Sequence, residues 1–222
     1  ATIAKTGHTP SDWITDKKAT VNAAGEKHKE CTECGEILEK ATIKQLKCSK
    51  PTIKAIANKD YGVRLEWGEV KGADSYKVYR KVSGGSYEYI GKTTKTAYAD
   101  KTAKSGKKYY YVVKAVNEAG SSDKSASKSI TFVDAPTIKT PSSAKSGITV
   151  KWSKVSGAEG YIVYRKTGSG SYERLAKIKG GTKVSYLDKT VKKGKTYSYK
   201  LVAYKGSTKS ASSAVKTIKD KY

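Results

Sequence analysis

The residues of this chain that could do metal or redox chemistry all lie within its first 50 positions. They are Cys31, Cys34, Cys48, His8 and His28, and the remaining 172 residues of the 222 contain neither amino acid. Two thiolates separated by two residues can bind one tetrahedral ion, and a glycine directly after them, here Gly35, lets the backbone turn so that amide N–H groups point at the sulfurs. The spacing therefore predicts a candidate structural zinc site.

One Cys-x-x-Cys pair supplies only half of a zinc ligand set, so the site needs further ligands. His8 and His28 are the candidates, with Cys48 as a substitute. The same residues also allow a Cys31–Cys34 disulfide, free thiols or a redox pair. A thioredoxin-like redox pair would need a βαβ context, which the surrounding sequence lacks.

The rest of the chain consists of two copies of one module. The segment Tyr-Lys-Val-Tyr-Arg-Lys at 76–81 returns as Tyr-Ile-Val-Tyr-Arg-Lys at 161–166, and Trp67 and Trp152 share the same offset of 85. Later residues match at an offset of 88, which indicates a three-residue insertion in the second copy. A repeat of this length is a domain duplication. We therefore expect three units, at 1–49, 50–134 and 135–222.

Enzymatic activity has little support in either copy. Neither copy has a His or Cys for a nucleophile–base pair, and the carboxylates are scattered. The glycines at 84–85 and 168–170 join two expected strands with no helix after them, unlike a phosphate-binding loop. A glycosidase with two carboxylates would need a larger cleft. We predict that this chain is not an enzyme.

The apolar pattern predicts an all-β fold. In both copies short runs alternate apolar and polar residues, as in half-buried strands, and no stretch has helical periodicity. The expected strands of the first copy are 52–57, 62–67, 75–82, 87–92, 98–100, 108–117 and 125–132. In the second copy, Ala135-Pro136-Thr137-Ile138 echoes Lys50-Pro51-Thr52-Ile53 at the start of the first copy. The expected strands of the second copy are 147–152, 161–166, 172–177, 186–188, 196–204 and 211–218. Each copy is predicted to be a seven-stranded, immunoglobulin-like sandwich, and residues 1–49 a small β-ribbon of about three strands at 13–16, 26–31 and 36–46.

Both copies resemble bacterial fibronectin type III domains. The resemblance depends on the second-strand Trp67 and Trp152, on the Tyr-x-Val-Tyr-Arg third strands, and on a turn followed by Tyr at Tyr109 and Tyr197. The last feature is similar to a tyrosine corner, in which the phenol bonds back to the turn. The resemblance covers nearly all of residues 51–222. It implies tandem sandwiches that act as spacers or binding scaffolds, with no enzymatic activity.

The N-terminal unit resembles a short module of surface proteins from anaerobic gut Firmicutes, a Gram-positive group. The matching residues are Gly7-His8, Trp13, Ala19-Thr20, Ala24-Gly25, Cys31-x-x-Cys34-Gly35 and Leu38-Glu39. Many copies of that module carry a Cys where this chain has Val21. The resemblance implies that Val21 removes one metal ligand, unless His28 or Cys48 replaces it.

The aromatic residues of the copies divide into two groups. Six of them lie on the apolar faces of expected strands and are predicted to form the core: Trp67, Trp152, Tyr76, Tyr161, Tyr109 and Tyr197. Tyr79, Tyr164, Tyr87 and Tyr172 lie near Lys on the opposite face or the adjacent hairpin. They are candidates for binding sugars or acidic polymers, although a Tyr that lies flat under Lys stems would look the same in sequence.

The net charge of +25 rises along the chain, from +2 over residues 1–50 to +16 over residues 135–222. Such an asymmetry indicates a polyanionic partner, and part of the charge will serve solvation and strand-edge protection. Only four of the 45 cationic residues are Arg, which argues against sequence-specific nucleic-acid binding. No apolar run approaches the length of a membrane span.

The sequence thus predicts a non-catalytic fragment of a secreted, cell-surface protein that spaces or adheres. Its expected partner is an anionic cell-wall polymer, a glycan or a host surface component. The alternative is an accessory carbohydrate- or wall-binding tail of a secreted glycoside hydrolase or peptidoglycan hydrolase. The absence of Met and the start at Ala1 indicate an excised piece of a longer protein.

Overall fold

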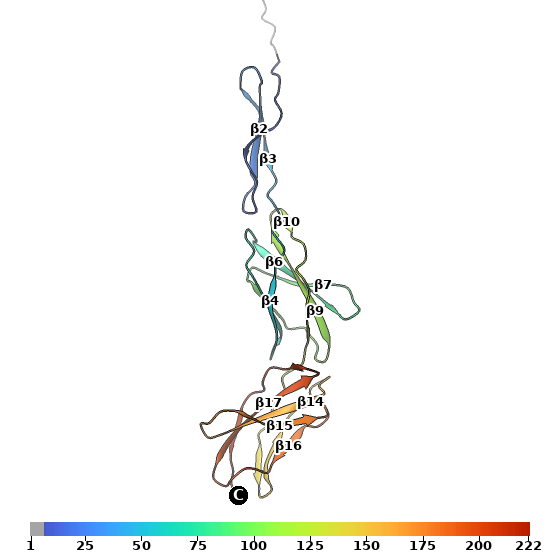
Figure 1. Cartoon of the computed structure of the whole chain (residues 1–222), viewed down its shortest axis with the longest axis vertical. Helices are drawn as coiled ribbons and strands as arrows, with labels where there is room; N and C mark the ends of the chain where they lie inside the picture. The colour runs from blue at the N-terminus through green and yellow to red at the C-terminus, as the bar shows by residue number, and fades with distance from the viewer. Residues whose placement is uncertain (1–6) are drawn as a thin grey trace, which may run out of the picture.

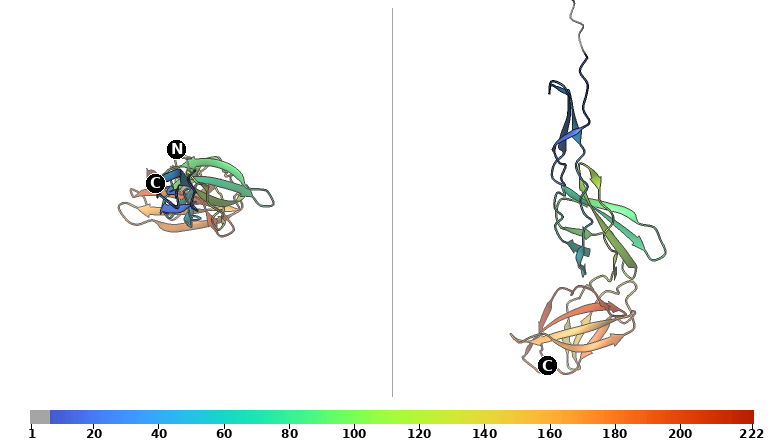
Figure 2. Two further views of the ribbon diagram at one scale, coloured as in Figure 1. Left: turned by 90° about the horizontal axis from the view of Figure 1, so that it is seen from above. Right: turned by 45° about the horizontal axis from the view of Figure 1, so that its top comes forward.

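The computed structural model describes residues 7–222 as three β units that follow one another along the long axis of the molecule (Figure 1). The view tilted by 45° keeps the same linear order, with the ribbon at one end and the second sandwich at the other (Figure 2). The described residues contain strands and turns and no helix, as the sequence predicts. Accordingly, no helix in this part of the chain could cross a membrane.

The N-terminal unit is a three-stranded antiparallel ribbon with β2 in the middle. Its strands are β1 (Ile14–Lys17), β2 (Gly25–Glu30) and β3 (Ile37–Ile43). Of residues 7–47, only Gly25 and Cys31 are buried. The ribbon therefore has no apolar core of its own, and Trp13 instead lies beneath the ammonium groups of Lys27 and Lys29, 4.1 and 4.8 Å from its ring centroid.

The first sandwich contains two antiparallel sheets, with strand orders β4-β5-β8 and β10-β9-β6-β7, and β11 also pairs with β9. This division of the strands is that of a fibronectin type III domain. The strands are β4 (Ile53–Lys59), β5 (Gly62–Trp67), β6 (Ser75–Val82), β7 (Glu88–Thr93), β8 (Ala97–Asp100), β9 (Lys108–Asn117), β10 (Gly120–Ser121) and β11 (Lys128–Thr131).

The second sandwich repeats this topology, with sheet orders β12-β13-β16 and β15-β14-β17-β18, and β19 also pairs with β17. Its strands are β12 (Ser142–Ala144), β13 (Gly147–Lys151), β14 (Gly160–Thr167), β15 (Glu173–Lys179), β16 (Ser185–Asp188), β17 (Thr196–Lys205), β18 (Thr208–Lys209) and β19 (Lys216–Lys219). The first strand differs from expectation. Ile138 makes only an isolated bridge to Trp152, and β12 begins after Pro141, because proline cannot donate to a β-ladder.

The core of each sandwich lies between its two sheets. All six aromatic residues predicted to be core are at most 3% exposed. Trp67 packs edge-on against Tyr76, with ring centroids 5.4 Å apart, and Trp152 meets Tyr161 at 5.2 Å. Alternation along a strand sends every second side chain to one face, which explains why these residues could be assigned from the sequence.

The last strand of each sandwich is interrupted. The sequence predicts continuous strands at 125–132 and 211–218, but only β11 and β19 form there. Upstream of β11, the Ser122 and Ser125 hydroxyls each accept a hydrogen bond from a backbone N–H of β9, both at 3.0 Å. Ser210 and Ser213 do the same for β17. A serine hydroxyl thus accepts the hydrogen bond that a backbone carbonyl of the last strand would accept in a regular ladder. Serine side chains commonly compete with the backbone in this way.

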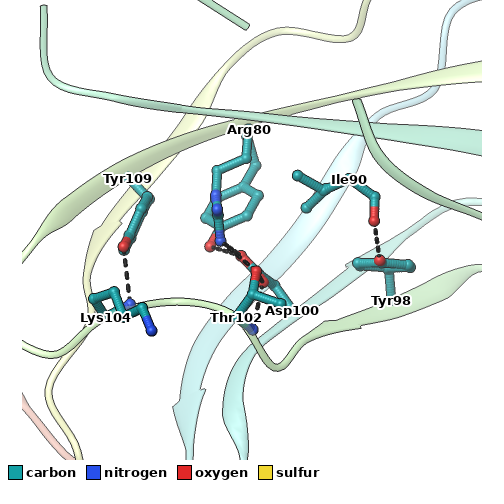
Figure 3. A network of polar contacts seen from close by, with 8 residues as sticks. Arg80, Ile90, Tyr98, Asp100, Thr102, Lys104 and Tyr109 are labelled. Atoms are coloured by element: carbon teal, nitrogen blue, oxygen red, sulfur yellow. Dashed lines mark hydrogen bonds and ion pairs between the residues drawn. The ribbon is translucent and has the colours of Figure 1, made fainter. Parts of the chain in front are cut away.

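A buried polar cluster connects the two sheets of the first sandwich (Figure 3). The Asp100 carboxylate accepts hydrogen bonds from Arg80 Nη1 at 2.6 Å, from Tyr111 Oη at 2.8 Å and from the Thr102 amide and hydroxyl. Asp188 holds Arg165, Tyr199 and Thr190 in the same way in the second sandwich.

Both tyrosine corners form. The Lys104 amide donates to Tyr109 Oη at 2.8 Å (Figure 3). The Lys192 amide donates to Tyr197 Oη at 2.8 Å. This turn-then-Tyr feature could be predicted because the two residues that bond are only five positions apart.

Candidate metal centre

The Cys-x-x-Cys segment lies at the end of the ribbon that is remote from the sandwiches. β2 ends at Glu30, and the chain turns through residues 31–36 into β3. The Gly35 amide donates to the Cys31 carbonyl at 2.9 Å, and Gly35 has a φ of +73°, which favours glycine. The segment around His8 lies alongside, since the Thr32 amide donates to the Thr9 carbonyl at 2.9 Å. We call residues 7–10 and 31–36 the ribbon tip.

The ribbon tip brings three of the predicted ligands together. The ligand atoms of His8, Cys31 and Cys34 all lie within 4.8 Å of one another. His8 Nδ1 is 3.5 Å from Cys34 Sγ, and its other nitrogen, Nε2, is 3.1 Å from a carboxylate oxygen of Glu36. Cys31 is buried and Cys34 exposed, and both are free thiols.

The surroundings of the two sulfurs favour a thiolate on Cys31. Hydrogen bonds from the Glu33 and Cys34 amides and from His8 lower the pKa of Cys31 to about 6. For Cys34 the Glu36 amide lowers the pKa, but the hydrogen bond with Cys31 and burial outweigh it and raise the pKa overall. The hydrogen bond with Cys31 and the charge of Glu36 raise the pKa of His8. The lowered pKa of Cys31 favours the deprotonated sulfur that metal binding requires.

Two other predicted ligands lie elsewhere. His28 is on β2, where its Nδ1 is 2.6 Å from Asp16 Oδ1 and its Nε2 is 3.6 Å from Glu30. It is therefore held by carboxylates of the ribbon and is not part of the His8 cluster. Cys48 is buried in the core of the first sandwich, where burial raises the pKa of its thiol. Cys48 therefore cannot substitute as a ligand at the ribbon tip.

Position 21 is also remote from the cluster. The Val21 carbonyl accepts hydrogen bonds from Gln45 Nε2 at 2.8 Å and from Asn117 Nδ2, in the first sandwich, at 3.1 Å. Val21 thus lies beyond the opposite end of β2 from Cys31, about 20 Å away at roughly 3.3 Å per residue. A cysteine at position 21 would not complete this cluster in the present fold.

The tyrosines proposed to bind ligands are half-buried on the outer faces of the sandwiches. Tyr79 packs edge-on against Tyr89, with ring centroids 5.7 Å apart. The Tyr87 ring lies under the ammonium groups of Lys81 and Lys124, each 5.1 Å from its centroid, and its hydroxyl donates to Ser127 Oγ. These contacts fix the position of the Tyr87 ring.

The second sandwich repeats part of this arrangement. Tyr172 lies under Lys200 at 4.2 Å and Lys166 at 5.5 Å. Tyr164 packs on a small apolar patch that contains Ile162 and Val202. Ligand binding by these tyrosines stays a prediction. Tyr89, which is 55% exposed, was not among the sequence candidates and is the most accessible ring of this group.

Glu36 is the residue of the ribbon tip that sequence reasoning missed. It follows the glycine of the Cys-x-x-Cys-Gly segment directly, and that adjacency was the available signal. Its contact with His8 joins residues 28 positions apart and depends on the pairing of the two loops. No spacing rule for metal sites contains that information.

Comparisons with known proteins give partial matches. No family model matches the chain. A segment of 60 residues, 26% of this chain, is 42% identical to an amylopullulanase from Thermoanaerobacterium saccharolyticum. The chain spans only 5% of the length of that enzyme.

Solved structures similar to the chain are fibronectin type III proteins. Chicken CNTN1 FN1–FN3 domains share 16% identity over 89% of this chain and 78% of theirs, with a TM-score of 0.37. A two-domain fibronectin type III segment of chicken tenascin shares 18% identity over 78% of this chain and 98% of its own, with a TM-score of 0.43. An Fn3-like protein from Clostridium thermocellum shares 32% identity over 39% of this chain and 95% of its own, with a TM-score of 0.34.

Proposed function

We propose that this chain, whose two larger units have the fibronectin type III fold, is a non-catalytic spacer and adhesion segment of an extracellular, cell-surface protein. The observation that carries the proposal is the linear arrangement of three β units along one axis (Figure 1). Both junctions in this arrangement are built from specific contacts. A spacer needs such junctions, because they keep a distal module away from its attachment point.

One amide side chain of the first sandwich makes hydrogen bonds to the ribbon unit at the junction between them. Asn117 Nδ2 donates to the carbonyls of Val21 at 3.1 Å and Leu46 at 2.8 Å, and Asn117 is itself buried. The loop at Gly72 approaches the same place, since a Cβ on Gly72 would lie 2.3 Å from the Val21 carbonyl oxygen. Cys48, in the sandwich core, anchors the segment that leaves the ribbon.

The junction between the sandwiches is a contact of two turns. A Cβ on Gly106 would lie 2.9 Å from the Cα of Gly157, so the backbones touch directly. The Ser105 hydroxyl donates to the Ser156 carbonyl at 2.8 Å. Lys205 Nζ donates to the Gly106 carbonyl at 3.0 Å. A contact of this kind restricts the angle between the two domains.

The charge of the second sandwich supports a polyanionic partner. Residues 135–222 carry a net charge of +16. Within this range the structure pairs only Arg165 with a carboxylate, that of Asp188. Apart from Lys205, whose ammonium group donates to the Gly106 carbonyl, the lysine ammonium groups are therefore available to a cell-wall polyanion or an anionic glycan.

The test measures retention of the chain on purified anionic wall polymer and on an uncharged glycan over a series of salt concentrations. We expect binding to the anionic polymer that weakens steeply with salt, because screening shortens the range of exposed charges. The fragment of residues 50–134, with a net charge of +8, serves as a less cationic comparison. Absence of retention at low salt, or retention that salt does not change, would contradict a polyanionic partner.

A second candidate function is an accessory module of a secreted glycan-degrading enzyme. The match to an amylopullulanase favours it. Affinity electrophoresis in gels that contain starch or pullulan distinguishes the two candidates. Slower migration in the neutral polysaccharide supports the accessory module, whereas retardation confined to anionic polymer supports the surface spacer.

A further inference from the structure

The ribbon tip gathers soft ligands in a unit that has almost no apolar core. Gly25 and Cys31 are the only buried residues among positions 7–47. A unit of this size without a core usually requires a disulfide or a metal ion for stability. The cluster of His8, Cys31 and Cys34 is where such a staple could form.

We propose that the ribbon tip binds one Zn²⁺ through His8 Nδ1, Cys31 Sγ and Cys34 Sγ, with the fourth coordination position open to water or an added ligand. A tetrahedral zinc ion with Zn–S of about 2.3 Å and Zn–N of about 2.05 Å places its nitrogen and sulfur ligands about 3.5 Å apart. The distance between His8 Nδ1 and Cys34 Sγ is 3.5 Å.

Glu36 positions the histidine. Its carboxylate lies 3.1 Å from His8 Nε2, the nitrogen that faces away from the sulfurs. A ligating histidine commonly donates its second N–H to a carboxylate, which fixes both the tautomer and the ring orientation. Glu36 therefore acts through His8 and does not itself coordinate the ion.

The fourth position is open because the described residues place only three ligand atoms in the cluster. Zinc sites that are purely structural have four protein ligands, whereas sites with three keep an exchangeable position. Cys34 is exposed, and the His8 side chain is 47% exposed. A small ligand can therefore reach the ion from solvent at the end of the molecule.

The test uses the full chain, reduced and freed of metal with a chelator, and titrates it with Co²⁺ as a spectroscopic probe for Zn²⁺. We expect one Co²⁺ per chain, with thiolate charge-transfer absorption and the intense visible bands of tetrahedral cobalt, and displacement by Zn²⁺. Addition of imidazole then shifts the visible bands. A reduced chain that takes up no Co²⁺ overturns the site, and bands insensitive to imidazole overturn the open position.

Variants assign the ligands. Replacement of both Cys31 and Cys34 by Ser abolishes the charge-transfer bands, and His8→Ala weakens Co²⁺ binding at least tenfold. Glu36→Ala weakens it about ten- to a hundredfold without changing the band positions, and Glu36→Gln, which keeps an acceptor oxygen, restores part of the loss. His28→Ala and Cys48→Ser bind as the parent does. Loss of binding in either of these two controls would refute the ligand assignment.

Stability of the ribbon provides an independent readout. Zinc should slow amide hydrogen exchange in β2 and β3 of the parent and not in the double Cys→Ser variant, because binding to the folded state alone stabilises it. Equal exchange with and without zinc would overturn a structural role. None of these measurements involves a wall polymer, so their outcome is separate from that of the proposed function.

Discussion

At the scale of single residues, the most consequential groups of the sandwiches are Asp100 and Asp188. Both carboxyls are buried, 2% and 0% exposed, and each is held by an Arg, a Tyr and a Thr. The sequence contains both sets at matching positions in the repeat. Their meeting could not be predicted, because Arg80 and Asp100 belong to different sheets and come together only when those sheets pack.

Replacement of Asp100 by Asn should destabilise the first sandwich by about 2–4 kcal/mol, because it leaves the partly buried Arg80 guanidinium without its charge partner. Urea unfolding gives the size of the loss, and hydrogen exchange assigns it to the first sandwich, with the second as an internal reference. Glu66→Gln breaks the exposed Arg64–Glu66 pair and should have little effect. A similar loss of stability in Asp100→Asn and Glu66→Gln would contradict the claim that the buried ion pair contributes more than the exposed one.

The same clusters predict a loss of stability in acid. Burial raises the pKa of Asp100, but hydrogen bonds from Tyr111, Thr102 and Arg80 outweigh it and hold the pKa below its ordinary value. Asp188 has a lowered pKa for the same reasons. A carboxyl with a lower pKa in the folded state stabilises it above the unfolded pKa of about 3.9, and this contribution is lost as the pH falls through the folded pKa.

We therefore expect the free energy of unfolding of both sandwiches to fall below about pH 4. Asp100→Asn should remove this part of the pH dependence from the first sandwich and leave it in the second. Urea unfolding at a series of acidic pH values measures it. If the free energy of unfolding of the first sandwich falls in acid as steeply in Asp100→Asn as in the parent, other carboxyls cause the loss of stability.

At the scale of elements, glycine decides how closely two strands approach. Gly62 begins β5 with a φ of +135°, and a Cβ there would lie 2.0 Å from the Asp100 carbonyl oxygen on β8. Gly147 has the equivalent role in the second sandwich, at 2.3 Å from the Asp188 carbonyl oxygen. The repeat shows in the sequence that Gly62 and Gly147 are equivalent. It does not show that each lies against the carbonyl oxygen of a neighbouring strand.

Gly62→Ala should destabilise the first sandwich by more than 2 kcal/mol, roughly the sum of backbone strain and the displacement of β8. Gly84→Ala is the matched control. Gly84 has a φ of +82° in the β6–β7 hairpin, but no atom lies within 4 Å of its Cβ position, so roughly 1 kcal/mol of strain is expected. Thermal unfolding measures both. An equal loss of stability in the two variants would show that backbone strain, and not the clash with β8, decides the cost of the substitution.

At the scale of the whole molecule, the angle between the sandwiches depends on the contact between Gly106 and Gly157. Gly194 occupies the position equivalent to Gly106 in the second sandwich, with φ of +78° and +82° respectively. No atom lies within 4 Å of a Cβ on Gly194. Gly194 therefore serves as a control for Gly106, because it has the same backbone conformation but no contact with a neighbouring sandwich.

Gly106→Ala and Gly194→Ala should cost similar stability from backbone strain, but only Gly106→Ala should change the relative orientation of the sandwiches. Small-angle X-ray scattering and residual dipolar couplings measure that orientation. The same scattering curve for both variants would mean that the turn contact does not set the angle.

The sequence by itself determined the all-β class, most of the strands and the core, but not the breaks in the terminal strands of the sandwiches. Side-chain direction along a strand alternates with a period of two, so the positions of Trp67 and Trp152 in the pattern were enough to predict their burial. Likewise the duplication was sufficient to predict two sandwiches of one topology, and the five-residue spacing was sufficient for the tyrosine corners. All of these depend on interactions that are local in the chain or on its repeat.

The tertiary structure alone decided which distant residues meet. His8 joins Cys31 and Cys34 while His28 does not, because the loop at residues 7–10 pairs with the turn after β2 and His28 is held by Asp16 within the ribbon. Cys48 joins a sandwich core instead of the ribbon tip. Such choices follow from strand register and from the packing of units on one another, and residue spacing does not encode either.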